Sequence, residues 1–453
     1  MPSGTASIPS GRIETLDSTQ ELILKRVWAN FLLHWGYKLD AKELLKEQQQ
    51  HQQQHQHQQQ QNAHSSNESS NSSGGSGFGF KKALFGMKKS SSNSSSSSES
   101  PSNSSSNRAR ANSLEVVYPR SYIHESLTKL DPVEVKTGFW EFLRTDYPDN
   151  LLLRFVRARK WDLDKTMNMI TATIHWRMKE AHPDKVIQKG EKEAFVNSSL
   201  PGLQKNLELR KVIIRGRDLK GRPIVFVRPR LHHSSQQTES EMEQFALIII
   251  EETRLFLKEP LVDQATIMFD MTGFGTSNMD YAPVKFLIKC FEAHYPECLG
   301  KLIIHKAPWV FSPIWNIVKN WLDPVVASKV VFTKNLKDLE KIINVQNIPE
   351  CLGGEDEPDL DHFPITDIQE WEKYDSKLKD TDTRDKLLAE RKQMVEAFIQ
   401  TTINWIEAKD KETSSKLLQE KIQQSKLLTE NYIALDPYVR SRSQFDIDGT
   451  IKL

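Results

Sequence analysis

Short β-branched runs alternate with longer segments of helical spacing between residues 264 and 332, and this alternation limits the fold more than any other feature of the chain. Strands that alternate with helices form a parallel sheet whose connections cross over as helices. The runs are residues 265–269, 302–304 and 330–332. Two earlier β-rich runs, 212–214 and 224–227, flank a turn-forming segment and predict a hairpin. We therefore predict an α/β fold with a mainly parallel sheet.

The segment between the last two predicted strands is apolar on more than one face. Its apolar positions are 309–311, 314, 315, 317, 318, 321, 322, 325 and 326. A helix that covers one face of a sheet needs only a single apolar stripe. Such a helix has either two apolar protein neighbours, as a buried core helix does, or one neighbour and an apolar ligand. The pattern alone leaves both interpretations open.

Composition excludes several broad classes of protein. The 453 residues carry a net charge of +1, which gives no general attraction to nucleic acid or to an anionic membrane. Three cysteines, at 290, 298 and 351, are too few and too widely spaced for a disulfide framework or a zinc site. No run approaches the ~20 apolar residues that span a bilayer, and the N-terminus does not resemble a signal peptide. These features predict a cytoplasmic protein with no metal and no nucleic-acid partner.

The first hundred residues combine one amphipathic helix with low-complexity sequence. Residues 18–35 open with a Ser-x-x-Glu capping box, and the apolar face of this helix either docks on a later domain or touches a membrane. The Gln/His and Ser/Asn tracts from 48 to about 107 cannot bury enough apolar surface to offset the entropy of ordering, so we expect disorder. Within them, residues 78–89 are either plain linker, a weak interfacial anchor or a docking motif.

Helices are expected before, between and after the predicted strands along the chain. Asp131 and Pro132 begin one helix, and a second over 150–160 ends in four cations that the pattern alone assigns to a solvated basic face. A capping box from Thr238 to Glu241 opens an unusually apolar helix. After residue 356, two apolar-periodic segments predict an antiparallel helix pair packed against the globular part.

No catalytic motif is present. The chain lacks a Gly-x-Ser-x-Gly elbow, a phosphate-binding Gly-x4-Gly-Lys-Ser/Thr loop and a His-Glu-x-x-His helix. Gly273-Phe274-Gly275 lacks the third glycine of a dinucleotide fingerprint, because Asn278 occupies that position. Asp270, at a predicted strand end, is either a catalytic carboxylate or a cap for the loop that follows. We therefore expect neither an enzyme nor a cofactor.

Several motifs occur in a fixed order along the chain. They are LLLRFVRARKWDLDKTMNMI at 151–170, GRPIVFVRP at 221–229, IMFDMTG at 267–273, YPE at 295–297, LDPVVASK at 322–329 and PECLGG at 349–354. Together they resemble the lipid-binding domain of the CRAL-TRIO family, and most of all fungal phosphatidylinositol transfer proteins of the non-classical, phosphatidylcholine-poor kind. The resemblance implies a hydrophobic lipid cavity closed by a gate helix, after a small three-helix domain and before a helical tail. The implied boundaries are 1–46 for an N-terminal amphipathic helix, 47–114 for a disordered linker, 115–190 for the helical domain, 191–356 for the lipid-binding domain and 357–453 for a helical extension.

The resemblance also implies the residues of the site. The positions for the lipid headgroup are Arg159, Lys160, Glu297 and Lys329. Cations suit a phosphodiester, and a carboxylate accepts hydrogen bonds from inositol hydroxyls. The gate helix, expected over 311–322 and bordered by prolines, includes Phe311, Ile314, Trp315, Ile317, Val318, Trp321 and Leu322. The residues expected to line the cavity are Phe245, Ile249, Ala265 and Ile267.

One departure from the family pattern concerns phosphatidylcholine. In members that bind it, hydroxyl residues stand on the strand before the Asp-x-x-Gly turn, whereas here those positions are Ala265 and Ile267. Thr266 lies one residue off and should point to the other face of the strand. We therefore expect little phosphatidylcholine exchange.

These observations predict a protein that binds phosphatidylinositol and transfers it between membranes, in support of phosphoinositide signalling and of lipid metabolism or membrane trafficking. The resemblance also implies a second, more apolar ligand such as a sterol or a squalene-like lipid. Transient membrane contact, lipid kinases or phospholipases as partners, and peripheral association with endomembranes or lipid droplets are expected as well. Two rival functions stay open: a lipid-sensing adaptor whose occupancy controls a protein partner, and an enzyme that acts on a hydrophobic substrate.

Overall fold

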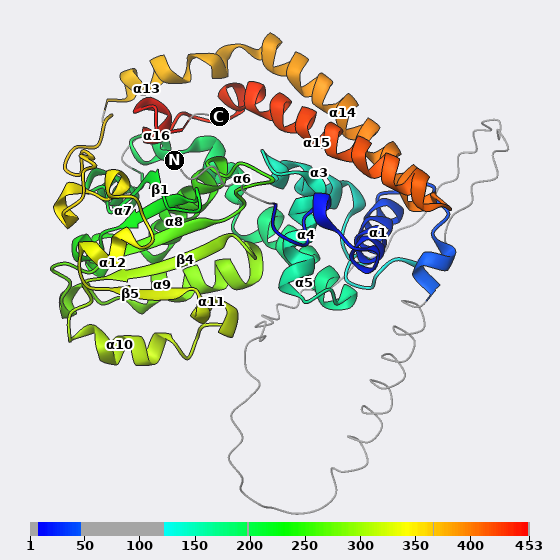
Figure 1. The fold of residues 1–453 in the computed structure, drawn as a ribbon. Coiled ribbons are helices and arrows are strands. Elements are labelled where there is room, and N and C mark those ends of the chain that lie inside the picture. Colours follow the sequence, from blue (N-terminus) through cyan, green and yellow to red (C-terminus); the bar gives the residue numbers. More distant parts are fainter. Residues whose placement is uncertain (1–7, 47–121, 197–198, 366, 452–453) are drawn as a thin grey trace, which may run out of the picture. The chain divides into compact units, whose positions relative to one another are not determined.

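The computed structural model describes residues 8–46, 122–196, 199–365 and 367–451. Within residues 199–365 the chain forms a five-stranded sheet with helices around it (Figure 1). The strands are β1 (Val212–Arg217), β2 (Pro223–Val227), β3 (Ala265–Asp270), β4 (Leu299–His305) and β5 (Val330–Thr333). They stand in sequence order across the sheet, with β1 and β2 antiparallel and all other neighbours parallel. The predicted α/β class, the hairpin and the parallel core are confirmed.

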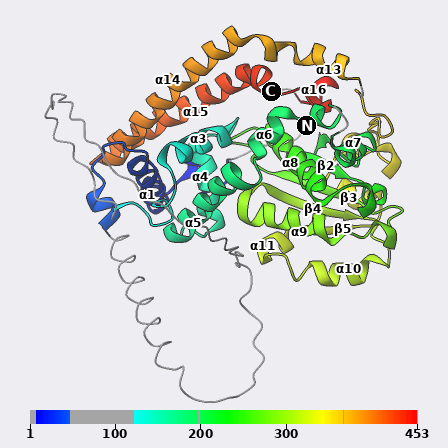
Figure 2. The ribbon, with the colours of Figure 1, turned by 180° about the vertical axis from the view of Figure 1, so that it is seen from behind.

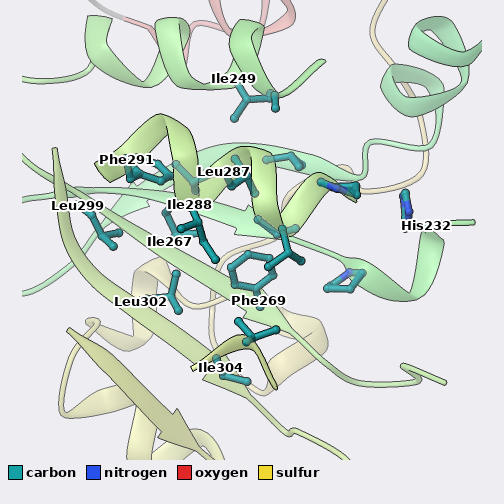
Figure 3. Close-up of a pocket in the computed structure, with 18 of the residues that line it drawn as sticks. His232, Ile249, Ile267, Phe269, Leu287, Ile288, Phe291, Leu299, Leu302 and Ile304 are labelled. Carbon is teal, nitrogen blue, oxygen red and sulfur yellow. The ribbon is translucent and has the colours of Figure 1, made fainter. Parts of the chain in front are cut away.

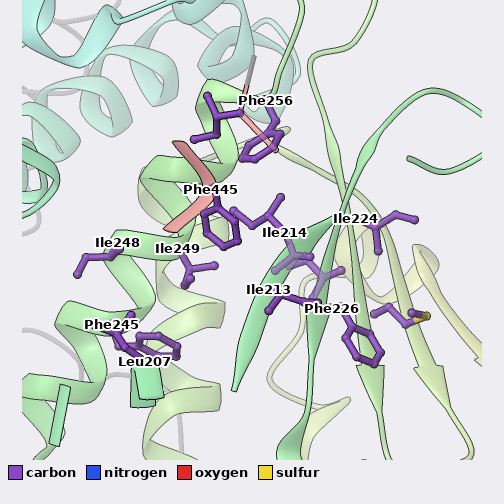
Figure 4. Packing of buried hydrophobic residues seen from close by; sticks show 14 of the residues in the cluster. Leu207, Ile213, Ile214, Ile224, Phe226, Phe245, Ile248, Ile249, Phe256 and Phe445 are labelled. Atoms are coloured by element: carbon purple, nitrogen blue, oxygen red, sulfur yellow. The ribbon is translucent and has the colours of Figure 1, made fainter. Parts of the chain in front are cut away.

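Helices cover the sheet and form its crossover connections. They are α7 (Pro201–Glu208), α8 (Glu239–Leu255), α9 (Tyr281–Lys289), α10 (Phe311–Val318), α11 (Pro324–Ser328) and α12 (Leu336–Glu340). The predicted capping box opens α8, since Thr238 and Glu241 each accept from the backbone N–H of the other. Phe245 and Ile248 of α8 belong to one buried cluster with Ile213 and Phe226 of the first two strands (Figure 4). The apolar faces of sheet and helix therefore share one core.

A helical layer precedes the sheet in the chain. Its helices are α1 (Ser18–His34), α3 (Pro132–Leu143), α4 (Pro148–Ala158), α5 (Leu163–His175) and α6 (Pro183–Lys189). Asp131 caps α3 and Pro132 is its first residue, as predicted. The predicted start of α1 was wrong by one residue, because the capping box joins Asp17 to Gln20 and not Ser18 to Glu21. Asp17 and Ser18 are both good caps, and the backbone selects the residue with extended φ and ψ.

A helical tail follows the sheet and confirms the predicted helix pair. Its helices are α13 (Ile368–Tyr374), α14 (Thr381–Glu407), α15 (Lys411–Val439) and α16 (Gln444–Ile447). The long helices α14 and α15 lie side by side in both views (Figures 1 and 2). Helix α1 packs against α4, α5 and α14, so its apolar face is docked within the protein. Of the two interpretations of that face, the docked one is confirmed.

The predicted linker, 47–114, with its Gln/His and Ser/Asn tracts and the lysine-flanked segment 78–89, lies outside the described residues. Within the part of the chain that the structure describes, no helix is both long and apolar enough to cross a bilayer.

Candidate functional site

A cavity of about 300 Å³ lies between the sheet and the helices that cover one of its faces (Figure 3). Strands β3 and β4 contribute Ile267, Phe269 and Ile304, while Ile249 of α8 and Leu287 of α9 approach from the opposite side. Aliphatic and aromatic side chains dominate the lining. A concave site of this size with mostly apolar walls and a few polar groups is typical of a small-molecule pocket.

The residues expected to line a cavity all contribute to this one, namely Phe245, Ile249, Ala265 and Ile267. Successive side chains of a strand point to opposite faces, so Ala265 and Ile267 share the cavity side of β3. Thr266 is fully buried on the other side, where its hydroxyl donates to Asp218 Oδ2 at 2.7 Å. No hydroxyl of this strand segment therefore reaches the cavity.

Helix α10 closes the cavity on one side, and it is shorter than expected. The helix ends at Val318, four residues before the predicted end at Leu322. Asp323 caps α11, and Pro324 occupies its first position, so the chain has to leave one helix before it can start the next. Of the seven predicted gate residues, five line the cavity: Phe311, Ile314, Trp315, Val318 and Leu322.

The other two gate residues lie elsewhere. Ile317 is 44% exposed on the outer side of α10. Trp321 follows the helix, and its ring packs edge-on against Tyr281 with 5.5 Å between centroids. Aromatic contacts also hold the helix to the body, because Phe311 meets Phe274 and Trp315 meets Phe332.

None of the four predicted headgroup residues lines the cavity, but Arg159, Glu297 and Lys329 are next to residues that do. Arg159 Nη2 is 3.5 Å from the carbonyl of Glu292, a residue that does line the cavity. Lys329 Nζ donates to the carbonyl of Leu299 at 2.7 Å, just after Glu297 in the chain. Within the described chain, the side chains of Lys160 and Glu297 make no hydrogen bond or ion pair. Both side chains can therefore form hydrogen bonds with a ligand, and the charge of Glu297 also acts on the buried Arg157.

Two of these residues have an uncommon backbone conformation. Lys160 has a φ of 53° and Glu297 a φ of 60°, in the left-handed region that side chains with a Cβ rarely adopt. Such conformations cost of order 1–3 kcal/mol each and persist where the surroundings hold them, often at functional sites. Lys160 follows the end of α4, and Glu297 precedes the start of β4.

A buried ion network fixes the segment that carries Glu297. The carboxylate of Glu251 in α8 is fully buried and pairs with the guanidinium groups of Arg144, Arg177 and Arg254. Tyr295 donates its hydroxyl to the same carboxylate at 2.7 Å. The cations hold the pKa of Glu251 well below its usual range, so the carboxylate stays ionised. Tyr295 thereby ties the turn before β4 to both α8 and the helical layer.

Comparison with known proteins decides the family. Residues 207–354 match the CRAL/TRIO domain and residues 122–172 its N-terminal domain. A protein of Eremothecium gossypii named "Phosphatidylinositol transfer protein CSR1" is 46% identical over 451 residues, which is 99% of this chain and 100% of that protein. The chain belongs to the CRAL-TRIO family. "CRAL-TRIO domain-containing protein C3H8.02" of Schizosaccharomyces pombe is 38% identical over 73% of this chain and 71% of its own length. "Phosphatidylinositol/phosphatidylcholine transfer protein SFH12" of Arabidopsis thaliana is 30% identical over 51% of this chain and 44% of its own length.

Two of the four cations at the end of α4 are not solvated. Arg154 is 2% exposed and donates to Glu259 at 2.9 Å and to the backbone carbonyl of Asp263 at 2.6 Å. Arg157 donates to the carbonyl of Gly11, and its pKa falls to about 10 because it is buried, although Asp263 and Glu297 oppose that shift. The interpretation as a solvated face was wrong for these two residues, because their acidic partners lie a hundred residues away in the chain.

The remaining chemical candidates carry structural roles. Asp270 caps the loop after β3, since its Oδ1 accepts from the backbone N–H of Thr272, and its Oδ2 pairs with Arg230 at 2.7 Å. Cys298 lines the cavity, but burial raises the pKa of its thiol and makes it a poor nucleophile. No group of three potential metal ligands occurs among the residues that the structure describes.

Sequence reasoning missed a second polar part of the CRAL-TRIO cavity. Lys211 and Arg228 line it where β1 begins and β2 ends, and His232 pairs with Asp280 nearby at 3.1 Å. The signal in the sequence was weak, because a cation next to a strand is usually solvated. The one usable hint was the GRPIVFVRP motif, in which the apolar run of β2 ends directly at Arg228.

Proposed function

We propose that this protein binds phosphatidylinositol and transfers it between membranes, with little exchange of phosphatidylcholine. The observation that carries the proposal is the apolar cavity with charged residues of both signs next to its lining, among them Arg159, Glu297 and Lys329. Moving a two-chain lipid out of a bilayer exposes on the order of 30 methylenes, and at about 0.8 kcal/mol each this costs about 24 kcal/mol unless protein walls replace the membrane. Similarity to a protein named for phosphatidylinositol transfer, at 46% identity over 99% of the chain, supports the same function.

The charges beside the cavity suit an inositol phosphate headgroup. Arg159, Lys160 and Lys329 would pair with the phosphodiester, and Glu297 would accept hydrogen bonds from ring hydroxyls. A carboxylate within a group of cations discriminates against lipids whose heads lack donors, because their approach leaves Glu297 unpaired. The headgroup would then stay near the surface while the acyl chains occupy the cavity.

A transfer assay between vesicles tests this proposal. Donor vesicles that carry labelled phosphatidylinositol should lose the label to acceptor vesicles in proportion to protein, whereas labelled phosphatidylcholine should stay close to the rate without protein. A lipid-sensing adaptor would bind the lipid without moving it, and an enzyme would change the lipid chemically. Either of those outcomes would contradict the proposal.

Hydroxyl groups on β3 should create phosphatidylcholine transfer. The double variant Ala265→Ser, Ile267→Thr adds two donors on the cavity side of the strand, each able to contribute about 1 kcal/mol. We expect phosphatidylcholine transfer to rise roughly tenfold or more above the wild-type background, and the vesicle assay measures it.

The matched control places a hydroxyl elsewhere in the same cavity. Ile304 lines it from β4, so Ile304→Thr makes a comparable polar change away from the two β3 positions. This control should leave phosphatidylcholine transfer at background. A rise in the control as large as that in the β3 variant would refute the position-specific explanation.

Exposed apolar side chains surround the closing helix and offer a membrane contact. Trp309 is 85% exposed just before α10, and Ile317, Val325 and Phe332 are 44%, 50% and 45% exposed. Apolar side chains in a cluster at the mouth of a lipid cavity suit insertion into the interface of a bilayer. Trp315 contacts Phe332 and Trp321 contacts Tyr281, so Trp309 is the tryptophan best placed to enter first.

Substitution Trp309→Ala should weaken vesicle binding about tenfold, since burial of a large apolar side chain contributes about 1.5–3 kcal/mol. Cosedimentation with liposomes measures the effect. Tyr374→Ala is the matched control, because Tyr374 is a large exposed aromatic residue on α13, outside the cavity lining. Equal loss of binding in both variants would argue against a membrane contact at α10.

A further inference from the structure

Two cations line the cavity at the start of β1 and the end of β2. Lys211 precedes β1, Arg228 follows β2, and the backbone N–H of Arg228 donates to the carbonyl of Lys211 at 2.9 Å. Both belong to the cavity lining, and they are 3% and 4% exposed. Two of the predicted headgroup residues, Arg159 and Lys329, instead contact the carbonyls of Glu292 and Leu299, before and at the start of β4. The cavity therefore has a second polar region that the proposed function does not use.

Neither of these cations has an acidic partner. Among the residues that the structure describes, no carboxylate lies within 4 Å of the side-chain nitrogens of Lys211 or Arg228. Lys211 Nζ donates only to the neutral amide oxygen of Gln237, at 3.2 Å. The nearby carboxylate of Asp280 is paired with His232. Both buried cations thus lack an ion-pair partner among the described residues, and of the carboxylates only the more distant Asp361 acts on Arg228.

The hydrogen-bond donors that Lys211 and Arg228 leave unused indicate what kind of ligand could bind between them. Arg228 donates through Nε and Nη2 to the carbonyls of Leu209, Arg210 and Leu360, and its Nη1 makes no hydrogen bond within the described chain. Lys211 has further ammonium donors beyond the one that meets Gln237. A compact acceptor with a single negative charge would satisfy these donors.

Burial of an unpaired cation is costly, and the protein retains the charge nonetheless. Burial lowers the pKa of Lys211 to about 8, and Lys205 adds to the shift. Below that pH the ammonium form still predominates. Buried charges in proteins are usually paired or bound to a ligand. An anion held at this point would remove the cost for both cations together.

We propose that the cavity also binds a long-chain amphiphile with a terminal carboxylate, of the fatty-acid class, whose head pairs with Lys211 and Arg228. The chain of such a ligand lies along the apolar walls that β3 and α8 supply, among them Ile249 and Ile267. This inference goes beyond the proposed function and does not rest on phosphatidylinositol transfer. It requires only the cavity and its two unpaired cations.

The decisive measurement compares three ligands of equal chain length: a fatty acid, the matching primary alcohol and the methyl ester. Each displaces a fluorescent apolar probe from the purified full-length protein at pH 7. A hydrogen bond to a charged group contributes about 1.5–3 kcal/mol, so the acid should bind about tenfold to a hundredfold more tightly than the alcohol or the ester. Equal affinities would overturn the proposal without any variant.

Three variants assign the preference to one residue. Lys211→Met should lose the preference for the acid while still binding the alcohol, which also reports that the cavity is intact. Lys211→Arg should keep the preference. Lys205→Met removes a nearby exposed lysine and should behave like the wild type. A Lys211→Met protein that keeps the wild-type preference would contradict the assignment.

Two further measurements distinguish a carboxylate ligand from a phosphate ligand, and fatty-acid binding from phosphatidylinositol transfer. A single-chain lipid with a terminal phosphate should bind less tightly than the acid; if it binds more tightly in a Lys211-dependent way, the site is a phosphate site and the carboxylate proposal is wrong. Phosphatidylinositol transfer by Lys211→Met should stay near the wild-type rate. A wild-type protein that transfers phosphatidylinositol but binds the acid no more tightly than the alcohol would reject this inference alone.

Discussion

Charge reversal at Lys329 is expected to lower phosphatidylinositol transfer at least a hundredfold. Lys329→Glu replaces a charge-assisted hydrogen bond to the lipid phosphate with repulsion, and a change of about 3 kcal/mol in binding corresponds to roughly a hundredfold. Glu297→Lys should have an effect of similar size, because it removes the acceptor for the inositol hydroxyls. The vesicle transfer assay measures both variants. The two changes together carry the strongest test of the headgroup site.

The fold should survive these changes. Lys329 Nζ makes one hydrogen bond, to the carbonyl of Leu299, and its loss should lower the free energy of unfolding by only about 1 kcal/mol. Lys334→Glu is the matched control, because Lys334 is an exposed lysine just beyond the other end of β5. It should transfer lipid at the wild-type rate. If Lys329→Glu transfers lipid as well as this control does, the headgroup assignment is mistaken.

The second large effect is expected at a buried ion pair between the tail and the helical layer. Lys421 of α15 and Asp149 of α4 are both fully buried, with 2.8 Å between Nζ and Oδ1. The ammonium also lies 4.1 Å from the ring centroid of Trp405. Asp149 Oδ1 accepts in addition from the indole N–H of Trp28 in α1, at 2.7 Å. One carboxylate thus joins α1, α4 of the helical layer and α15 of the tail.

Asp149→Asn should lower the free energy of unfolding by about 3–5 kcal/mol, because it leaves the ammonium of Lys421 buried without its counter-charge. The asparagine still offers an acceptor to Trp28, so the effect isolates the charge. Unfolding in urea measures it. Proteolysis under native conditions should also be faster, since a larger fraction of the molecules is unfolded.

A double variant distinguishes a broken pair from general damage. Adding Lys421→Met removes the unpaired cation, so the double variant should recover most of the stability lost in Asp149→Asn. Lys416→Met, at an exposed position of α15, should change stability by less than about 0.5 kcal/mol. A double variant less stable than Asp149→Asn alone would show that the pair is not the cause.

Local chemistry along the chain was sufficient to predict the sheet and several helix starts. The β-branched runs predicted β3, β4 and β5 because short apolar segments rich in β-branched residues favour strands. The pair Asp131 and Pro132 and the box from Thr238 to Glu241 predicted two helix starts, because capping depends on residues three positions apart. Strand periodicity likewise places Ala265 and Ile267 on one face.

The family motifs led further than periodicity did. They indicated a cavity, a closing helix and four charged positions beside it, although no pattern of spacing implies that Arg159 and Lys329 approach the same end of a sheet. Lys329 reaches the carbonyl of Leu299 because β5 pairs with β4, and Arg159 reaches the carbonyl of Glu292 from the end of α4. The role of these residues in binding lipid stays a prediction.

The sequence by itself determined the α/β class, the hairpin, the caps and the alternation of faces, because each of these depends on residues within a few positions of one another. Only the tertiary structure decided that Arg154 is buried, that α10 ends at Val318 and that Lys211 and Arg228 meet without a carboxylate. Whether a cation is solvated, paired or facing a cavity depends on residues from distant parts of the chain. The residues next to it in the sequence do not show which of these residues will lie close to it in the fold.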